Sequence, residues 1–452
     1  MTSSAAIPPF GKPGQEAPLL RSRPPGPNSR TFLLRLGEVA APMGPMPDPE
    51  LSPGRAAAQA GTIVYARGEG VNVIDVDENR FVDLAGTFGG LLLGHRHPAV
   101  VRALTLQGER LLSALGDVHP SDAKVALSER LATLYPAGPA QVILAQSGSD
   151  AVSAALKTAV LATGRPGVIA FGGAYHGLGY GPLAACGLRA SYREPFATQL
   201  GNHVRFVEYP GDQAAQERAL DGVRRELATG TVGAIVVEPI LGRGGVVVPP
   251  EGFLPELARA AHEAGALLVA DEIWTGLGRA GALLRSASVL PDLVCLGKGL
   301  GGGLPVSAVI GRKDVMASWR RPAEVVHTST FAGAPLACAT ALATLDVLSR
   351  ERLPERAALV GKRFIERIAQ ALTDARSSAT VRGEGLMVGI DLGGQPGAGA
   401  RLMRALLARG YITTTGGGRR EVLVLTPPLI IAEELLEGFV QALGPALEEA
   451  LS

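Results

Sequence analysis

Apolar and polar residues follow two different repeats along the chain. Residues 62–84 alternate in short runs on either side of the polar triplet Asp77-Glu78-Asn79, which predicts antiparallel strands joined by a turn. From about Ala99 onward, compact apolar runs alternate with segments of helical spacing. Apolar runs of this kind are typical of a mostly parallel sheet that is covered by helices on both faces. The pattern therefore predicts an α/β fold.

The two ends of the chain differ from this central part. The first 60 residues are rich in proline and show little periodicity, which predicts an arm along the surface. After residue 345, a helical stretch leads to short alternating segments and a final amphipathic helix. We therefore expect a proline-rich arm over 1–60, the N-terminal part of a small α+β domain over 61–98, a large domain over 99–345 and the C-terminal part of the small domain over 346–452.

Composition limits the kind of partner. The 452 residues carry 43 basic and 42 acidic side chains, so a net charge of +1 gives no reason to expect nucleic acid or an anionic membrane. The N-terminus lacks the pattern of a signal peptide, and no run of about 18 apolar residues predicts a membrane span. The three scattered cysteines favour a reducing compartment. We expect a cytoplasmic protein that acts on a small molecule.

Chemically useful residues stand where the apolar runs end. Gly148 and Ser149 follow QVILAQS, Glu238 follows VGAIVV, Asp271 ends ALLVAD, and Lys298 follows DLVCLG. In open α/β sheets, ligands bind outside the carboxyl ends of the strands. The sequence therefore predicts one site to which all these segments contribute.

Lys298 and Asp271 indicate the chemistry of this site. A lysine at the edge of a buried strand favours the neutral, nucleophilic amine, although a lone lysine between glycines also fits a surface loop. An aspartate at a strand end also fits a helix cap. Together they match the needs of the cofactor pyridoxal 5′-phosphate (PLP). In PLP enzymes, a lysine binds the aldehyde of the cofactor as a Schiff base, and a carboxylate keeps its pyridine nitrogen protonated.

Two further segments agree with this cofactor. Gly148 and Ser149 open a predicted helix, where backbone N–H groups and the helix dipole favour a phosphate, although a plain helix cap explains them too. Tyr175 stands in a glycine-rich loop, where it could stack on a planar ring or simply pack. His95 and His97 give too few ligands for a metal site.

Six segments, in this order, resemble the class III PLP-dependent aminotransferases, which include ornithine, acetylornithine and 4-aminobutyrate aminotransferases. The resemblance extends from about Tyr65 to Ile431 and implies a fold type I homodimer with active sites at the subunit interface. The segments are SGSDAVSAALK, AYHG, VEPILGRGGVVVPPEGF, LLVADEIWTGLGRAG, LGKGLGGGLPVSA and HTSTFAGAPLACATALA.

The resemblance implies a role for each candidate residue, all of them near one cofactor. These roles are: Lys298, the Schiff-base lysine that moves a proton; Asp271, the partner of the pyridine nitrogen; Ile273 and Tyr175, one on each face of the ring; Gly148 and Ser149, the phosphate site; Thr330, a phosphate ligand from the partner subunit; Glu238, a carboxylate near the cofactor; and Phe88, a residue lining the substrate pocket.

Three positions depart from the members that act on ornithine or 4-aminobutyrate. Val424 stands in place of their arginine, Arg243 in place of their glutamate, and Trp274 in place of a glutamine that reaches the cofactor. Arg243 could bind a substrate carboxylate, since a guanidinium matches a carboxylate with two hydrogen bonds. It could equally face solvent or pair with Glu251.

The resemblance favours a transaminase that moves an amino group from an amino acid or ω-amine to a 2-oxo acid such as 2-oxoglutarate or pyruvate. The family also contains epimerases, an aminomutase and a decarboxylase, which would use the same residues without exchanging the nitrogen. A non-catalytic member is a third alternative, but Lys298, Asp271, Tyr175 and Thr330 are all present.

Overall fold

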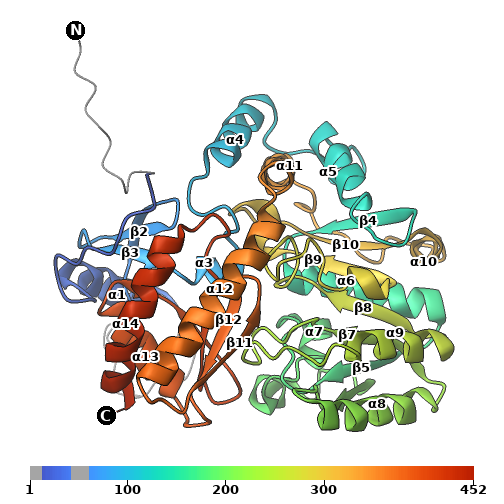
Figure 1. Cartoon of the computed structure of the whole chain (residues 1–452). Coiled ribbons are helices and arrows are strands. Elements are labelled where there is room, and N and C mark those ends of the chain that lie inside the picture. Colours follow the sequence, from blue (N-terminus) through green and yellow to red (C-terminus); the bar gives the residue numbers. More distant parts are fainter. Residues whose placement is uncertain (1–12, 42–60, 452) are drawn as a thin grey trace.

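A seven-stranded sheet forms the centre of the computed structural model, which describes residues 13–41 and 61–451 (Figure 1). Its strands lie in the order β4-β10-β9-β8-β7-β5-β6, and every pairing is parallel except those of β10. The predicted α/β fold with a mostly parallel sheet is confirmed. The strands of this sheet are β4 (Ala140–Ala145), β5 (Gly167–Phe171), β6 (Val204–Val207), β7 (Val232–Val237), β8 (Leu267–Asp271), β9 (Leu293–Leu296) and β10 (Ser307–Arg312).

Helices cover both faces of this sheet. Because successive side chains of a strand point to opposite faces, Val168 and Val236 pack toward α6, whereas Ile169 and Ile235 pack toward α8 and α9. Burial on both faces explains why these strands are apolar throughout. The helices of this part are α4 (Pro98–Arg110), α5 (Asp122–Ala132), α6 (Gly148–Thr163), α7 (Tyr180–Ala184), α8 (Gln213–Leu227), α9 (Phe253–Glu263), α10 (Lys313–Met316) and α11 (Pro335–Arg350).

Two smaller sheets combine the beginning and the end of the chain. β13 pairs in parallel with β3, so Tyr411 lies opposite Val82, and α12, α13 and α14 lie beside these sheets (Figure 1). The smaller α+β part therefore comes from both chain ends, as predicted. Its elements are β1 (Tyr65–Glu69), β2 (Asn72–Asp75), β3 (Arg80–Asp83), α3 (Gly86–Gly89), α12 (Leu353–Asp374), β11 (Thr380–Glu384), β12 (Met387–Asp391), α13 (Ala398–Leu407), β13 (Tyr411–Ile412), β14 (Thr414–Gly416), β15 (Val422–Leu425) and α14 (Glu433–Leu451).

The N-terminal arm contains a helix that the sequence pattern did not predict. In α1 (Pro27–Val39), the backbone N–H groups of Asn28 and Ser29 donate to the carboxylate of Asp77, at 2.7 and 2.8 Å. The cap is therefore supplied by a residue far along the chain, which local periodicity does not reveal. Residues 1–12 and 42–60 lie outside the described residues, and the predicted domain limits stay predictions. No helix in the described parts of the chain is both long and apolar enough to span a membrane.

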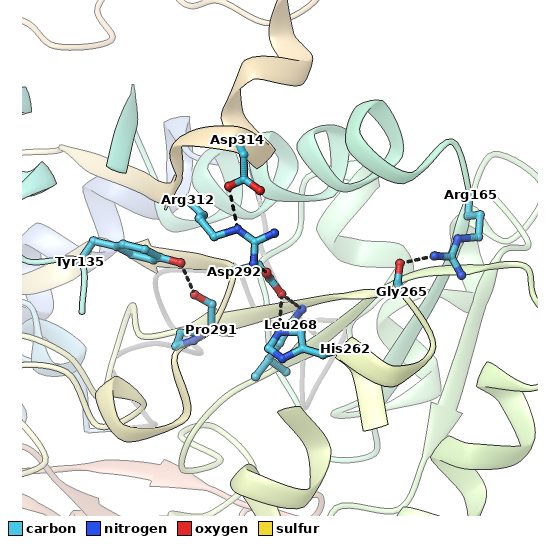
Figure 2. A network of polar contacts seen from close by, with 9 residues as sticks. All are labelled: Tyr135, Arg165, His262, Gly265, Leu268, Pro291, Asp292, Arg312 and Asp314. Carbon is cyan, nitrogen blue, oxygen red and sulfur yellow. Dashed lines mark hydrogen bonds and ion pairs between the residues drawn. The ribbon is translucent and has the colours of Figure 1, made fainter. Parts of the chain in front are cut away.

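The two ends of the parallel strands hold different kinds of polar groups. The carboxyl ends of β8 and β9 lead to Asp271 and Lys298, whereas Asp292 stands at the amino end of β9. The buried Asp292 carboxylate accepts hydrogen bonds from the Leu268 backbone N–H at 2.8 Å and from Arg312 at 2.9 Å, and it lies 2.9 Å from His262 (Figure 2). This carboxylate ties β8, β9, β10 and the end of α9 together, away from the candidate site.

Replacing Asp292 with alanine should destabilise the fold by about 2 kcal/mol, because it removes these contacts and leaves the N–H of Leu268 buried without an acceptor. The measurement is the midpoint of thermal unfolding. Asp314→Ala is the matched control, because the exposed Asp314 also bonds Arg312, at 2.7 Å, and an exposed pair contributes about 1 kcal/mol at most. Equal losses in the two variants would contradict the role assigned to Asp292.

Candidate active site

Lys298 lies two residues after β9 and begins the short helix η4 (Lys298–Gly301). Its φ of 42° lies in the left-handed region that non-glycine residues rarely adopt, and such strain concentrates at functional sites. Burial of the ammonium group lowers the pKa of Lys298 to about 8, against the opposing charges of Asp271 and Glu238. A lysine with this pKa is partly neutral near physiological pH and can act as a nucleophile or a base.

Asp271, the last residue of β8, forms a buried pair with His176. The Nδ1 atom of His176 lies 2.7 Å from one carboxylate oxygen, and the Ile273 N–H donates to the other at 3.1 Å. Burial lowers the pKa of His176, but the hydrogen bond and charge of Asp271, together with the charge of Glu238, outweigh this effect and raise it. The contacts with His176 and with the Ile273 N–H therefore fix the orientation of the Asp271 carboxylate.

His176 is a residue of this site to which the sequence motifs assign no role. The signal was present, because His176 directly follows Tyr175 in the glycine-rich loop after β5. Its partner, however, is 95 residues away in the sequence. The contact depends on the packing of β5, β7 and β8 side by side in the sheet.

Glu238 fixes the two loops that surround this pair. Its carboxylate is buried after β7 and accepts hydrogen bonds from the N–H groups of Tyr175 at 2.7 Å and Gly242 at 2.9 Å. Burial raises the pKa of Glu238, an effect that the charge of His176 opposes. The role of Glu238 is therefore to position the loops that carry Tyr175 and Arg243.

The start of α6 forms a close-packed turn that suits an anion. Ser147 caps the helix by accepting a hydrogen bond from the Asp150 N–H at 3.2 Å, and the Ser149 hydroxyl accepts one from the Gly179 N–H at 3.0 Å. A Cβ atom on Gly177 would lie 2.6 Å from the Cβ of Ser149. Backbone N–H groups at the beginning of a 16-residue helix favour a phosphate here.

The loop after β7 carries Arg243 back toward Tyr175. The guanidinium carbon of Arg243 lies 5.1 Å from the centre of the Tyr175 ring, and the charge of Arg243 also acts on Lys298. Of the two alternatives that the sequence left open for Arg243, this geometry favours a position beside Tyr175.

The remaining predicted residues divide into two groups. Ile273 and Gly148 meet, since a Cβ atom on Gly148 would lie 2.9 Å from the Ile273 side chain, and Trp274 contacts Lys298. Phe88 and Thr330 are exposed on the single chain. Among the described residues, the structure thus brings most of the predicted site together but leaves Phe88 and Thr330 at its surface.

His95 and His97 have other partners than a metal. The Nε2 atom of His95 lies 3.0 Å from the Asp83 carboxylate, and His97 accepts a hydrogen bond from the Ala99 N–H at the beginning of α4. Both therefore hold local structure.

The described residues of this group fit PLP. His176 Nε2, Arg243 Nε and Trp274 Nε1 are buried and have no hydrogen-bond partner among the described residues. Buried polar groups are normally paired, so the unpaired atoms of His176 and Arg243 leave hydrogen bonds available for a polar ligand, whereas the Nε1 edge of Trp274 packs against Gly89. The aldehyde of PLP needs a lysine with a lowered pKa, and its ring nitrogen needs a buried carboxylate. Its phosphate suits the beginning of a helix, and the site offers all three groups.

Known proteins resemble this chain over most of its length. The family model Aminotransferase class-III matches residues 55–447. The acetylornithine aminotransferase of Methanopyrus kandleri is 38% identical over 387 residues, which cover 85% of this chain and 94% of that protein. The 4-aminobutyrate aminotransferase of Mycobacterium tuberculosis is 35% identical over 404 residues, which cover 83% and 88%.

Solved structures agree with these relatives. An amine transaminase from an uncultivated Pseudomonas species, solved in its PLP-bound form, has a TM-score of 0.82 at 28% identity and covers 91% of this chain and 98% of that one. The ornithine aminotransferase of Toxoplasma gondii ME49 has a TM-score of 0.79 at 27% identity and covers 93% and 95%.

Replacing His176 with glutamine should change how stability depends on pH. The pKa of His176 is raised in the folded chain, so its stabilising effect is fully present below 6.5 and is lost as pH rises through the folded value. We expect the wild-type advantage in the unfolding midpoint of the cofactor-free protein to be larger at pH 5.5 than at pH well above neutral. The exposed His203→Gln serves as control, and an advantage that grows with pH would contradict the pairing.

Proposed function

We propose that Lys298 is the residue that binds PLP covalently. This chain belongs to the class-III aminotransferases, which transfer amino groups with PLP. One observation carries the proposal: the amine of Lys298 has a pKa lowered to about 8 and lies within reach of the charge of Asp271, on the adjacent strand. A nucleophilic amine beside a fixed carboxylate is the pair that this cofactor needs.

The proton positions follow from the contacts of Asp271. Bound PLP supplies an aldehyde for the amine of the substrate and a ring that accepts electrons when a C–H bond breaks. Asp271, oriented by its contact with His176, would hold the proton of the ring nitrogen. Lys298, neutral in part near its pKa of about 8, would accept the proton from the substrate carbon and carry it during the transfer.

The surrounding residues orient the ring and the phosphate. We assign the two faces of the ring to Ile273 and Tyr175, and the phosphate to the backbone at Gly148 and the hydroxyl of Ser149. The Ile273 N–H bonds to Asp271 and the Tyr175 N–H bonds to Glu238, so buried carboxylates set both backbone positions. Preorganised groups of this kind cost no rearrangement during the reaction.

Arg243 is our candidate for recognition of a substrate carboxylate. Its Nε–H is buried and unpaired among the described residues, and its guanidinium lies over Tyr175, next to the proposed ring position. The names of the relatives suggest N-acetylornithine, ornithine and 4-aminobutyrate as the first amino donors to test. We propose 2-oxoglutarate or pyruvate as acceptor.

We also propose a homodimer in which Thr330 reaches the phosphate of the partner's cofactor. Exposed apolar side chains gather on neighbouring segments of this region, including Leu112, Leu115, Val325 and Phe331. The segments touch, because Thr328 donates to the Asp117 carboxylate at 3.3 Å. Extended apolar patches mark interaction surfaces, and light scattering would give the molar mass. A cytoplasmic location stays a prediction.

Epimerisation, rearrangement and decarboxylation would use the same lysine and aspartate. The family and the transaminase structures do not favour them. They differ from transamination in one observable respect: the amino nitrogen stays on the product instead of passing to a 2-oxo acid.

Lys298→Ala should abolish the visible absorption band of bound PLP, because Lys298 is the only lysine among the described residues that we assign to the site. In the wild-type protein, one of the three donors added without a 2-oxo acid should remove this band and release a carbonyl product. Later addition of 2-oxoglutarate or pyruvate should restore it. A band that persists in Lys298→Ala would contradict the assignment, and a donor that is altered without loss of nitrogen would favour the alternative reactions.

Arg243→Ala should raise the KM of a carboxylate-bearing substrate by about 10- to 100-fold while kcat changes less, because a lost carboxylate contact weakens ground state and transition state alike. Arg243→Lys should recover part of the loss, since it keeps the charge but not the two-pronged geometry. Steady-state kinetics for each substrate, with the exposed Arg376→Ala as control, give the measurement. Unchanged constants for every substrate would exclude this role.

A further inference from the structure

The amine of Lys298 has an aromatic neighbour. Its Nζ atom lies 4.0 Å from the centre of the Trp274 ring. At this distance the electron-rich face of an indole attracts a cation, most strongly where water is excluded. Trp274 follows β8 and Lys298 follows β9, so two adjacent strands bring the pair together.

The indole is held in a single orientation. A Cβ atom on Gly89 would collide with the Nε1 edge of the ring, and one on Gly242 would collide with its benzene edge, so the ring fits only between two glycines. Trp274 is 5% exposed. It packs in an apolar cluster made of Ile240, Val246, Ala280, Met387, Val422 and Val424. A ring fixed in this way offers a surface of fixed position to the lysine.

Val424 and Trp274, two of the departures from the ornithine and 4-aminobutyrate members, belong to this same cluster. A charged side chain in place of Val424 would lie in the apolar cluster that also contains Trp274, and no member of this cluster could pair with its charge. The small, apolar side chain of Val424 therefore suits the apolar cluster in which the large ring of Trp274 is packed.

We propose that the indole face of Trp274 is the resting surface of the Lys298 amine whenever that amine is not bonded to the cofactor, and that it stabilises the protonated amine there. The proposal rests on the proposed function, in which Lys298 is the cofactor-binding lysine. Amino transfer would need such a resting place, because the amine of Lys298 would leave PLP when a substrate amine binds there, and it would have to stay close enough to carry a proton.

Four charged side chains also act on the amine of Lys298, in addition to the neutral indole. Burial lowers the pKa of Lys298, and the positive charges of Arg243 and Arg279 lower it further, whereas the carboxylates of Asp271 and Glu238 raise it. The indole face favours the ammonium form and so acts in the same direction as the two carboxylates. Unlike a carboxylate, it binds the cation without forming a hydrogen bond that must break when the proton leaves.

Fluorescence tests the contact without any cofactor. The chain has two tryptophans, and Trp319→Phe leaves Trp274 as the only indole. We expect the emission of the cofactor-free Trp319→Phe protein to change between pH 6 and pH 10 with a midpoint near 8, where Lys298 titrates. Adding Lys298→Met should abolish this change. A change that persists unaltered in the double variant, or no change in the single one, would overturn the proposal.

The pH dependence of PLP uptake tests the direction of the effect. Only the neutral amine attacks the aldehyde, so the rate of uptake by the cofactor-free protein should rise with pH through the pKa of Lys298. In Trp274→Leu the midpoint should fall by about one pH unit, because the ammonium loses its aromatic partner. Trp274→Phe keeps a weaker aromatic face and should show a smaller shift, and Trp319→Phe none.

The two measurements separate the possible failures. A purely structural role of Trp274 would slow PLP uptake at every pH but leave its midpoint in place, and that result would overturn the proposal. If Trp274→Leu does not fold, Trp274→Phe retains an aromatic ring and decides the question. If the wild-type protein takes up no PLP, the proposed function fails, while the fluorescence titration still reports on the contact between Trp274 and Lys298.

Discussion

The buried charges at the carboxyl edge of the central sheet are the constraint on which the site depends. Lys298, Asp271, Glu238 and His176 are ionisable, and an isolated charge removed from water would be costly. They are tolerable because they neutralise one another: His176 pairs with Asp271 at 2.7 Å, and Glu238 accepts two backbone N–H groups. Burial lowers the pKa of Lys298 against the charges of the two carboxylates, and the contact with His176 holds Asp271 in a fixed orientation. These are the two properties that PLP chemistry requires.

The sheet separates this site from a second buried carboxylate at its other end. Asp292 joins β8, β9 and β10 through one backbone and two side-chain partners, and none of these partners belongs to the candidate site. The same two strands, β8 and β9, therefore carry a structural carboxylate at their amino ends and reactive groups at their carboxyl ends. Anchoring the strands at one end helps to keep Asp271 and Lys298 in register at the other.

The departures from the ornithine and 4-aminobutyrate members form a consistent set. Trp274 and Val424 share one apolar cluster, and Arg243 brings a positive charge to the Tyr175 side of the site. Apolar surface has thus replaced polar groups beside Lys298, while a cation stands on the neighbouring loop. We expect these three residues to affect which substrate binds rather than the chemistry, because we assign the chemistry to Lys298 and Asp271.

The amino-acid pattern was enough to predict the α/β class and the apolar strands that precede Gly148, Glu238 and Lys298 and end at Asp271, because burial on both faces of a sheet leaves a continuous apolar run. It did not determine the helix of the N-terminal arm, whose cap comes from Asp77. Nor did it reveal that His176 meets Asp271 or that Trp274 lies under Lys298. Only the tertiary structure decided these contacts, since each joins residues from separate segments whose distance depends on strand order and loop packing.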